Sequence, residues 1–504
     1  MLLNEIQWSQ QTDYPFLAMI QLLPLLAIAV VNILKNERAI IFSGVLISVV
    51  EFALVVNVYR LFDSTNPAFQ FAENFIIAGP IVYHAAVDGV SILFMLLTAL
   101  LSFLVILYSY VRGFAPWNRF LTVLFAVEAA LMSMFVTLDL LWFSIMSALQ
   151  LIPVSYLLWR WSTSPEKDIA LTRFLQFMFA AVVLLLAGTI MLAWNYSTLN
   201  NGEWTFDIYK LIKTPVDAEI SSVVFFLLFY GLAIRVPLFP FHGWLPITAE
   251  HGTIAIAPMF LLGLKTGIYG LYRFVFPILP DAVLQWHQFV VGFAVAGVFY
   301  AALLALMQVN VRRLLAYAVV SHTGILVIGL FSLNDIAFMG TIMLSATFGL
   351  AITGLLFATG IIYQRTGTAL FEHMGGLMDY IPVVGVTFLL ASLSIIGMPG
   401  TPGFDAVHLV LEAAIHRFGA LVTIAAAVGN VIAAGFLLRA FQYAFLTART
   451  GDKTPPKNIE PTRFLEYLVC IILVLVLLVV GFYSEPWLQL ISKSVEGLGT
   501  LYTH

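Results

Sequence analysis

The chain has 504 residues, of which 61% are hydrophobic and only 10% are charged, and its formal net charge is −4. Soluble domains carry about 45–50% apolar and about 25% charged residues, so this composition excludes a water-soluble protein. No basic run is long enough to indicate nucleic-acid binding, and the single cysteine, Cys470, excludes an internal disulfide framework and cysteine-ligated zinc or iron–sulfur centres.

Hydrophobic runs of about 20 residues, the length needed to cross a bilayer, predict an all-α polytopic membrane protein of about fourteen transmembrane helices. The predicted spans are 16–34, 39–60, 89–111, 118–138, 140–159, 174–195, 219–241, 253–278, 285–308, 313–332, 336–362, 380–414, 418–446 and 464–484. The connections 61–88 and 196–218 are polar enough to lie outside the membrane. Asp88, just before the third span, is predicted to cap it.

The distribution of Lys and Arg predicts how the chain is oriented in the membrane. Fourteen of these residues fall in connections after odd-numbered spans, and six fall in the even connections and the tails. Positive charge marks the cytoplasmic side. We therefore expect both termini on the lumenal or periplasmic side.

Lys265 lies about midway along the apolar span 253–278. A charged lysine at the centre of a bilayer costs at least about 2.5–3.5 kcal/mol, so we expect it to face the interior of the bundle. A buried lysine can release its proton, which suits a proton path. Snorkelling to the headgroups is the alternative, but the residue lies too far from both ends of the span.

Two spans are predicted to break. Arg235 is followed by Pro237 and Pro240, and proline removes a backbone donor, so the helix should end just past Arg235. Arginine stays protonated and can set a field or anchor a neighbouring group, but it should not carry a proton. The second break lies in 380–414, at Pro399 and Pro402.

Broken helices at matching positions in two halves indicate an inverted repeat with an ion path at its centre. The breaks fall in spans seven and twelve, which predicts repeats at 118–278 (helices 4–8) and 279–446 (helices 9–13). The remaining segments are the N-terminal helices 1–3 at 1–117 and a C-terminal loop with helix 14 at 447–504.

Further ionisable residues lie inside predicted spans. His322 is in span ten, where a relay and an ordinary core histidine are both possible, and Glu128 is in span four. Asp405, His408 and Glu412 follow the second break with helical spacing, either buried in the path or at the membrane interface. Glu51 is in the peripheral second span, where a contact with a partner subunit is an alternative.

Several stretches together resemble the antiporter-like membrane subunits of complex I, which are related to Mrp-type cation/proton antiporters. The resemblance is closest to chain 4, the NuoM or NdhD type, and it covers about residues 80 to 445. The matching stretches are VDGVSILFMLLTAL at 87–100, TLDLLWFSIMSALQLIPVSYLL at 137–158, AIRVPLFPFHGWLP at 233–246, LKTGIYGLYRF at 264–274, VRRLLAYAVVSHTGI at 311–325, IIYQRTGTALFEHMGGL at 361–377 and GMPGTPGF at 397–404.

The resemblance implies fourteen helices, inverted repeats and broken helices seven and twelve. It assigns the family's proton-path lysine of helix eight to Lys265 and the histidine of helix ten to His322. Arg235 stands where the family has a lysine. Polar positions of the family in helices five, eleven and twelve are occupied here by Ala148, Phe348 and Val407.

The resemblance also implies the complex, the cofactors and the membrane in which the chain would work. The chain would be a proton-translocating membrane-arm subunit of an NAD(P)H or ferredoxin:quinone oxidoreductase, beside other antiporter-like subunits. Quinone, here plastoquinone, and iron–sulfur clusters would belong to partner subunits, and no cofactor is expected in this chain. The divergent pattern resembles cyanobacterial forms linked to CO2 uptake, in the thylakoid membrane or otherwise a bacterial inner membrane. The alternatives are an Mrp-type Na+/H+ antiporter subunit and a scaffold that conducts no protons.

Overall fold

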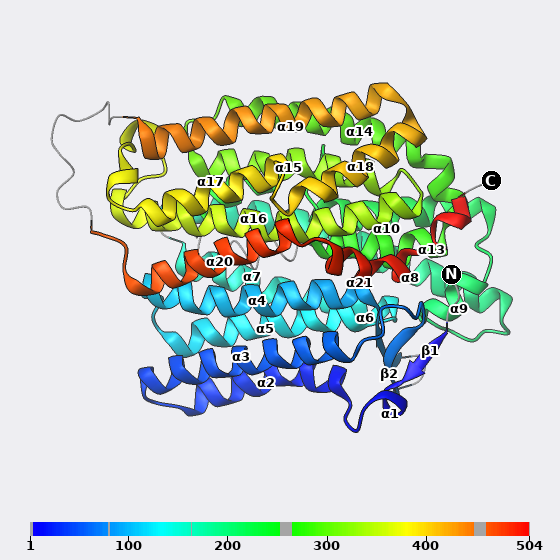
Figure 1. Ribbon diagram of the computed structural model, residues 1–504. Helices are drawn as coiled ribbons and strands as arrows, with labels where there is room; N and C mark the ends of the chain where they lie inside the picture. Colours follow the sequence, from blue (N-terminus) through cyan, green and yellow to red (C-terminus); the bar gives the residue numbers. More distant parts are fainter. Residues whose placement is uncertain (1–3, 79–80, 163, 253–264, 448–459, 503–504) are drawn as a thin grey trace.

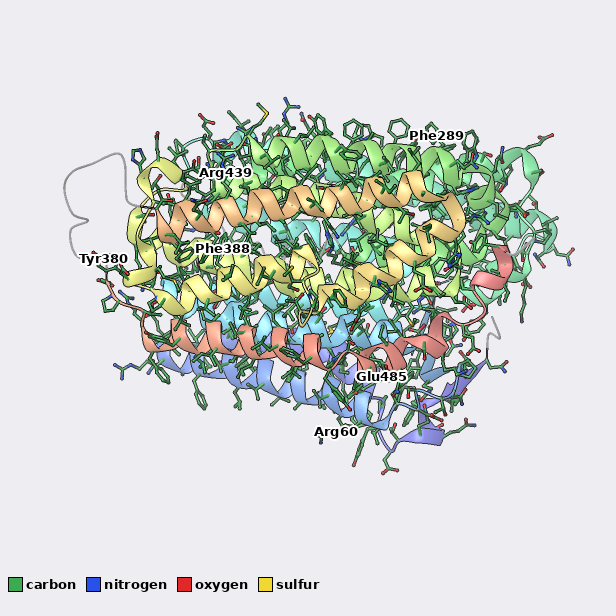
Figure 2. The ribbon with its side chains drawn as sticks, turned by 45° about the horizontal axis from the view of Figure 1, so that its top comes forward. Arg60, Phe289, Tyr380, Phe388, Arg439 and Glu485 are labelled. Carbon is green, nitrogen blue, oxygen red and sulfur yellow. The ribbon has the colours of Figure 1, made fainter. Side chains whose placement is uncertain are left out.

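The computed structural model describes residues 4–78, 81–162, 164–252, 265–447 and 460–502. Its long helices lie side by side in one bundle (Figure 1), and both ends of the chain lie at the same end of it. We call this the terminus end. Side chains cover the bundle in Figure 2, which shows Tyr380 at the opposite end and Phe289 on the outer surface of α14. Phe289 is 44% exposed, as suits a side chain that faces lipid.

Twelve helical segments among the described residues are long and apolar enough to cross a membrane. They are α2 (Phe16–Ile33), α3 (Glu37–Leu61), α4 (Gly89–Arg112), α5 (Trp117–Val136), α6 with α7 (Leu140–Leu149 and Leu151–Trp161), α8 (Lys167–Leu199), α10 (Ala218–Arg235), α14 (Pro280–Leu306), α15 (Val311–Leu330), α16 (Asp335–Thr366), α19 with η5 (Ala420–Phe441 and Gln442–Leu446) and α20 (Phe464–Phe482). The prediction of a polytopic helical membrane protein is confirmed.

The two other predicted spans are the eighth and the twelfth. Much of the eighth, 253–278, lies outside the described residues; the described part is helical from 265 and continues through η2 (Leu271–Val275) and α13 (Phe276–Ile278). The twelfth, 380–414, consists of α17 (Pro382–Ile396) and α18 (Gly403–Phe418), so the predicted break is confirmed. The count of fourteen and the inverted repeats stay predictions.

A small sheet departs from the all-α prediction. The polar connection 61–88 contains β2 (Phe69–Ala78) and β3 (Ile81–Val87), which pair antiparallel. β1 (Glu5–Gln7) adds to β2 in parallel. These strands lie at the terminus end, close to α9 (Ile208–Lys213) and the short α1 (Trp8–Gln11) (Figure 1).

Shorter helices complete the chain. They are α11 (Trp244–His251), α21 (Glu485–Val495), η3 (Phe371–His373), η4 (Leu377–Asp379) and η6 (Gly499–Tyr502). α4 and α16 form the centre of the bundle and are buried along almost their whole length. α2, α3 and α20 lie at its periphery, with most of their side chains at least partly exposed.

The N-terminus of α4 is held by an ion pair inside the protein. The Asp88 carboxylate accepts a hydrogen bond from the Ser91 backbone N–H, which confirms the predicted cap. It also accepts one from Nη2 of Arg273 in η2, at 2.6 Å, and both side chains are buried. The cap therefore joins two segments that are 185 residues apart in the sequence.

A histidine clasp joins the sheet to α9 outside the membrane spans. His84 of β3 lies between two carboxylates: one ring nitrogen is bonded to Asp207, at the start of α9, and the other lies 2.8 Å from Oε2 of Glu5. Burial disfavours the charged imidazolium, but the hydrogen bonds to Asp207 and Glu5 outweigh it and raise the pKa of His84 from 6.5 to about 9. The clasp is therefore charged at neutral pH.

This raised pKa predicts how stability depends on pH. The clasp contributes fully below pH 6.5, and the contribution, at most about 3 kcal/mol, is lost as the pH rises through about 9. We expect His84→Gln to lower the melting temperature of the purified protein at pH 6 and to have little effect at pH 10. His373→Gln, which changes an exposed histidine, is the control. An effect of His84→Gln that stays constant from pH 6 to pH 10 would contradict the charged clasp.

Candidate functional site

Arg235 occupies the first helix break. α10 ends at Arg235, and the chain then turns through Pro237 and Pro240 before α11 begins. One carbonyl freed by the break, that of Ile234, accepts a hydrogen bond from Nε1 of Trp244 at 3.0 Å. The predicted end of the helix just past Arg235 is confirmed, and an indole N–H replaces part of the missing helical bonding.

The Arg235 guanidinium is buried and held by neutral groups. It donates to the carbonyl oxygen of Ser147 at 2.9 Å, to the hydroxyl of the same serine, and to Oε1 of Gln150 at 2.7 Å. These acceptors flank Ala148 at the junction of α6 and α7. Among the described residues, no carboxylate pairs with Arg235. Arg235 is thus a fixed positive charge inside the bundle.

Lys265 is buried, with only 4% of its surface exposed. Its helix packs closely on the end of α10 because Gly267 has no side chain: a Cβ there would lie 2.8 Å from the carbonyl oxygen of Leu232. Nζ of Lys265 lies 4.4 Å from the ring centroid of Phe348 on α16, a cation–π contact. No carboxylate of the described residues lies within ion-pair distance of the amine.

His322 contacts the same phenyl ring as Lys265. It lies on α15, and its imidazole stacks on Phe348 with ring centroids 3.9 Å apart and planes 11° from parallel. Nε2 of His322 is buried without a hydrogen-bond partner among the described residues. The structure thus brings two of the predicted site residues together, and Phe348 is the group that both of them contact.

Other buried polar atoms lie on α16, which packs against the His322 helix α15, and on α17, which packs against α16. Thr341 Oγ1 and Ser345 Oγ on α16, and Ser394 Oγ on α17, have no partner among the described residues. Buried polar groups in proteins are usually satisfied by protein atoms or by ordered water. This part of the bundle is therefore polar enough to hold water molecules, which a path for protons needs.

The cluster after the second break faces outward. Asp405, in the first turn of α18, accepts a hydrogen bond from the hydroxyl of Ser484, and His408 is exposed. Glu412 is partly exposed, whereas Val407 on the same helix is buried. No interaction between this cluster and Lys265 is found among the described residues. A role of the cluster in the path stays a prediction.

Glu128 is buried on α5, and a second buried acid, Glu51, lies on the neighbouring helix α3. The hydroxyl of Ser102 on α4 lies beside the Glu128 carboxyl. The helix of Glu51, α3, is peripheral as predicted, but the Glu51 side chain points into the bundle, where it is 1% exposed. No contact of either carboxyl with Lys265 or Arg235 is found in the described part of the chain.

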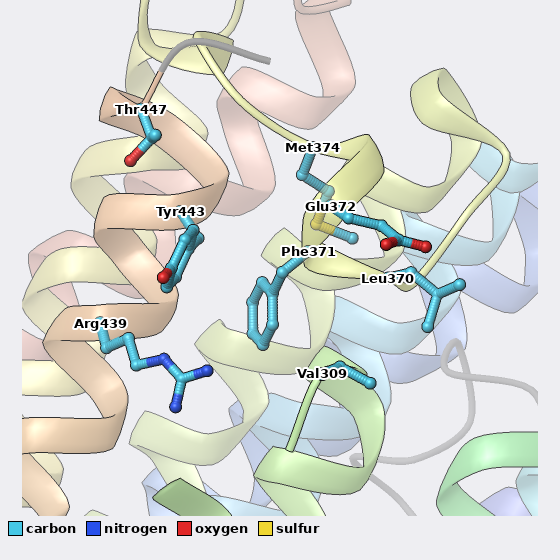
Figure 3. A pocket seen from close by; sticks show the side chains of 8 residues that line it. All are labelled: Val309, Leu370, Phe371, Glu372, Met374, Arg439, Tyr443 and Thr447. Carbon is cyan, nitrogen blue, oxygen red and sulfur yellow. The ribbon is translucent and has the colours of Figure 1, made fainter. Parts of the chain in front are cut away.

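A separate cavity of about 400 Å³ lies at the end of the bundle opposite the termini. Figure 3 shows its lining side chains: Val309, Leu370, Phe371, Glu372, Met374, Arg439, Tyr443 and Thr447. Arg439 donates to the carbonyl oxygen of Leu306, and its guanidinium lies 5.4 Å from the ring centroid of Tyr443. The cavity contains none of the predicted site residues.

Two features of the site could not be read from the sequence. Phe348 stood out only as an apolar residue at a family position, because no local pattern shows that it contacts both Lys265 and His322. Arg273 was not singled out as a site residue, although it lies in the predicted span 253–278 and its side chain is buried. An arginine in an otherwise apolar run was the one available signal for its ion pair.

The chain is similar to known proteins over most of its length. Residues 137–433 match the family model described as NADH:quinone oxidoreductase/Mrp antiporter, TM. NAD(P)H-quinone oxidoreductase chain 4 1 from Nostoc sp. is 29% identical over 508 residues, which cover 96% of this chain and 91% of the relative.

Two solved structures are also similar. A chain of respiratory complex I from Thermus thermophilus with bound NADH is 26% identical, with a TM-score of 0.86 over 97% of this chain and 100% of that chain. A chain of the Mrp complex from Dietzia sp. is 20% identical, with the same TM-score of 0.86 over 97% of this chain and 98% of that chain. The second likeness shows the fold alone.

Proposed function

The chain belongs to the NADH:quinone oxidoreductase/Mrp antiporter transmembrane family, and from this premise we propose that it carries protons through the membrane arm of a complex I-type quinone oxidoreductase. It is an antiporter-like membrane subunit of the complex I type, as the relatives over its whole length indicate. The observation that carries the proposal is the buried Lys265 amine, which has His322 beside it across one phenyl ring.

Each residue of the group has a separate role in the proposal. Lys265 takes up and releases a proton, because a buried lysine, unlike an arginine, can lose its proton. His322 passes the proton onward through waters bound at the unpaired polar atoms of α15, α16 and α17. Arg235 supplies a constant positive field, since its guanidinium keeps its proton and its partners are neutral.

Phe348 separates the two proton carriers. A phenyl ring neither donates nor accepts a conventional hydrogen bond, so direct transfer between Lys265 and His322 is blocked while the ring stays in place. The ring also holds the amine by a cation–π contact worth up to about 2 kcal/mol in a desolvated site. Proton transfer therefore needs the ring to move or water to pass around it.

This arrangement predicts a gain of conduction from Phe348→His. An imidazole at this position offers one donor and one acceptor between the two neighbours, so we expect proton conduction by the complex in proteoliposomes to rise by about tenfold or more; a positioned acid–base group contributes up to about 10²–10⁴-fold. Phe348→Leu, which is apolar but cannot hydrogen-bond, is the matched control. Unchanged conduction in a correctly assembled Phe348→His complex would rule out the ring as the barrier.

A scaffold without conduction is the second candidate. It is favoured by the neutral surroundings of Arg235 and by the apolar residues Ala148, Phe348 and Val407, which leave Lys265 with no carboxylate partner among the described residues. An Mrp-type antiporter subunit is a third reading, which the shared fold supports as well as it supports complex I. The Mrp structure is 20% identical to this chain and the complex I structure is 26% identical, so the comparison does not favour the antiporter over the complex I subunit.

We further propose that the complex is a specialised cyanobacterial form linked to CO2 uptake, with plastoquinone and iron–sulfur clusters in its partner subunits, in the thylakoid membrane. The Nostoc relative and the divergent polar positions support this assignment. Affinity purification of the tagged chain from its native membranes tests it. Quinone-reducing partners with a CO2-hydrating subunit are expected, whereas an assembly without quinone reductase activity would support the antiporter reading.

A further inference from the structure

Two buried carboxyl groups lie on neighbouring helices in the N-terminal part of the bundle. Glu51 lies near the middle of α3 and Glu128 near the middle of α5, two helices that pack side by side with α2 and α4 (Figure 1). Their side chains are 1% and 0% exposed, and α3 packs directly against α5. Both helices are candidate membrane spans, so the pair lies at the depth of the hydrocarbon.

The surroundings of the pair hold little that could neutralise two negative charges. The nearest cations on the same helices are Arg60 and Arg119, each nine residues away, or about 13.5 Å along the helix axis. α2 has no ionisable side chain, and α4 has only Arg112 and two tyrosines toward its end. Neither oxygen of Glu51 has a hydrogen-bond partner among the described residues.

The other elements packed against α5 add no compensating charge at this depth. On β3, His84 is engaged by Asp207 and Glu5, and on α7 the only cation is Arg160, at the end of the helix. The Ser102 hydroxyl beside Glu128 is neutral. Two ionised carboxylates in such a place would each lack solvation and would also repel each other, so at least one must carry a proton.

We propose that Glu51 and Glu128 form a second protonation site in the membrane, which holds an exchangeable proton between the two carboxyls. A proton needs one oxygen, whereas a metal cation needs several ligands, and no group of three or more His, Cys, Asp or Glu suited to a metal is found in the described part of the chain. The site is separate from the Lys265 group and does not rest on the function proposed for that group.

Infrared difference spectroscopy on the assembled complex in native membranes tests the proposal, because a protonated carboxyl has its own C=O absorption. We expect this band in the wild type and its loss in the double variant Glu51→Gln/Glu128→Gln. In each single variant one carboxyl stays in the same apolar surroundings, where an ionised form lacks solvation, so the band should be retained. Glu37→Gln, an exposed position of α3, should leave the band unchanged.

A second measurement does not need the variants to fold. Carbodiimides modify protonated carboxyls in apolar surroundings, so mass spectrometry of wild-type membranes should find the modification at Glu51 or Glu128 and not at Glu37. Absence of the modification at both, or its prevention by sodium ions, would overturn the proposal. Lys265→Met should leave both readouts unchanged, which keeps this test independent of the proposed path.

Discussion

Complexes that carry Lys265→Met should assemble and reduce quinone but should translocate protons poorly through this subunit. Methionine has nearly the length and volume of lysine, so the packing against Phe348 persists, but its thioether carries no proton. Loss of a positioned proton carrier lowers a rate by about 10²-fold or more, and we expect a loss of that size in the flux through this subunit. The measurement is proton uptake into sealed vesicles, divided by quinone reduction in the same sample.

Lys265→Arg separates the charge of the residue from its ability to exchange a proton. Arginine keeps the positive charge and the cation–π contact with Phe348, but it does not deprotonate. Conduction should therefore fall as it does in Lys265→Met. Lys493→Met, at an exposed position of α21, is the matched control for loss of a lysine. Equal pumping by assembled wild-type and Lys265→Met complexes would leave only the scaffold role.

The parts of the site that follow from local sequence were predictable. A single proline can stay inside a helix, as Pro24 does in α2. Pro237 and Pro240 together remove two backbone donors within four residues, so the break after Arg235 needed no knowledge of the fold. Lys265 stood out because a single charge in a long apolar run has few tolerable positions. Both predictions therefore used only the residues next to Arg235 and Lys265 in the sequence.

Contacts between distant segments were not predictable in the same way. Lys265 and Phe348 are 83 positions apart, and the helical pattern of α16 is apolar all round, so no periodicity indicates which face Phe348 occupies. Glu51 appeared peripheral because α3 is peripheral, but only the rotation of the helix decides whether a side chain faces lipid or the bundle. The strands in 61–88 were not predicted, because they lie in a polar connection and form no apolar run of helical length.

Asp88 shows how a correct local prediction can be incomplete. Its role as a helix cap follows from its position before an apolar run, and the structure confirms it. The same carboxylate binds Arg273, whose guanidinium also donates to Tyr269 Oη at 3.2 Å and to Ser91 Oγ at 3.3 Å. The ring of Phe69, from β2, covers the guanidinium at 4.9 Å. The pair thus ties α4, the end of the Lys265 segment and the sheet together.

Arg273→Met should therefore be among the most destabilising single substitutions in the chain. It leaves the Asp88 carboxylate buried without its partner, and breaking a buried ion pair in this way costs about 3–5 kcal/mol. We expect a clearly lower melting temperature and a smaller amount of assembled complex, measured by thermal denaturation and native gel electrophoresis. Arg463→Met, which breaks an exposed ion pair with Glu460, should change stability by less than about 1 kcal/mol.

The double variant Arg273→Met/Asp88→Asn distinguishes the unpaired charge from lost packing. Asparagine is as good a helix cap as aspartate, so the α4 cap survives while the negative charge disappears. If the uncompensated carboxylate causes the damage, the double variant should be more stable than Arg273→Met alone. If it is no more stable, the cation–π and hydrogen-bond contacts of the guanidinium, and not its charge, hold these segments together.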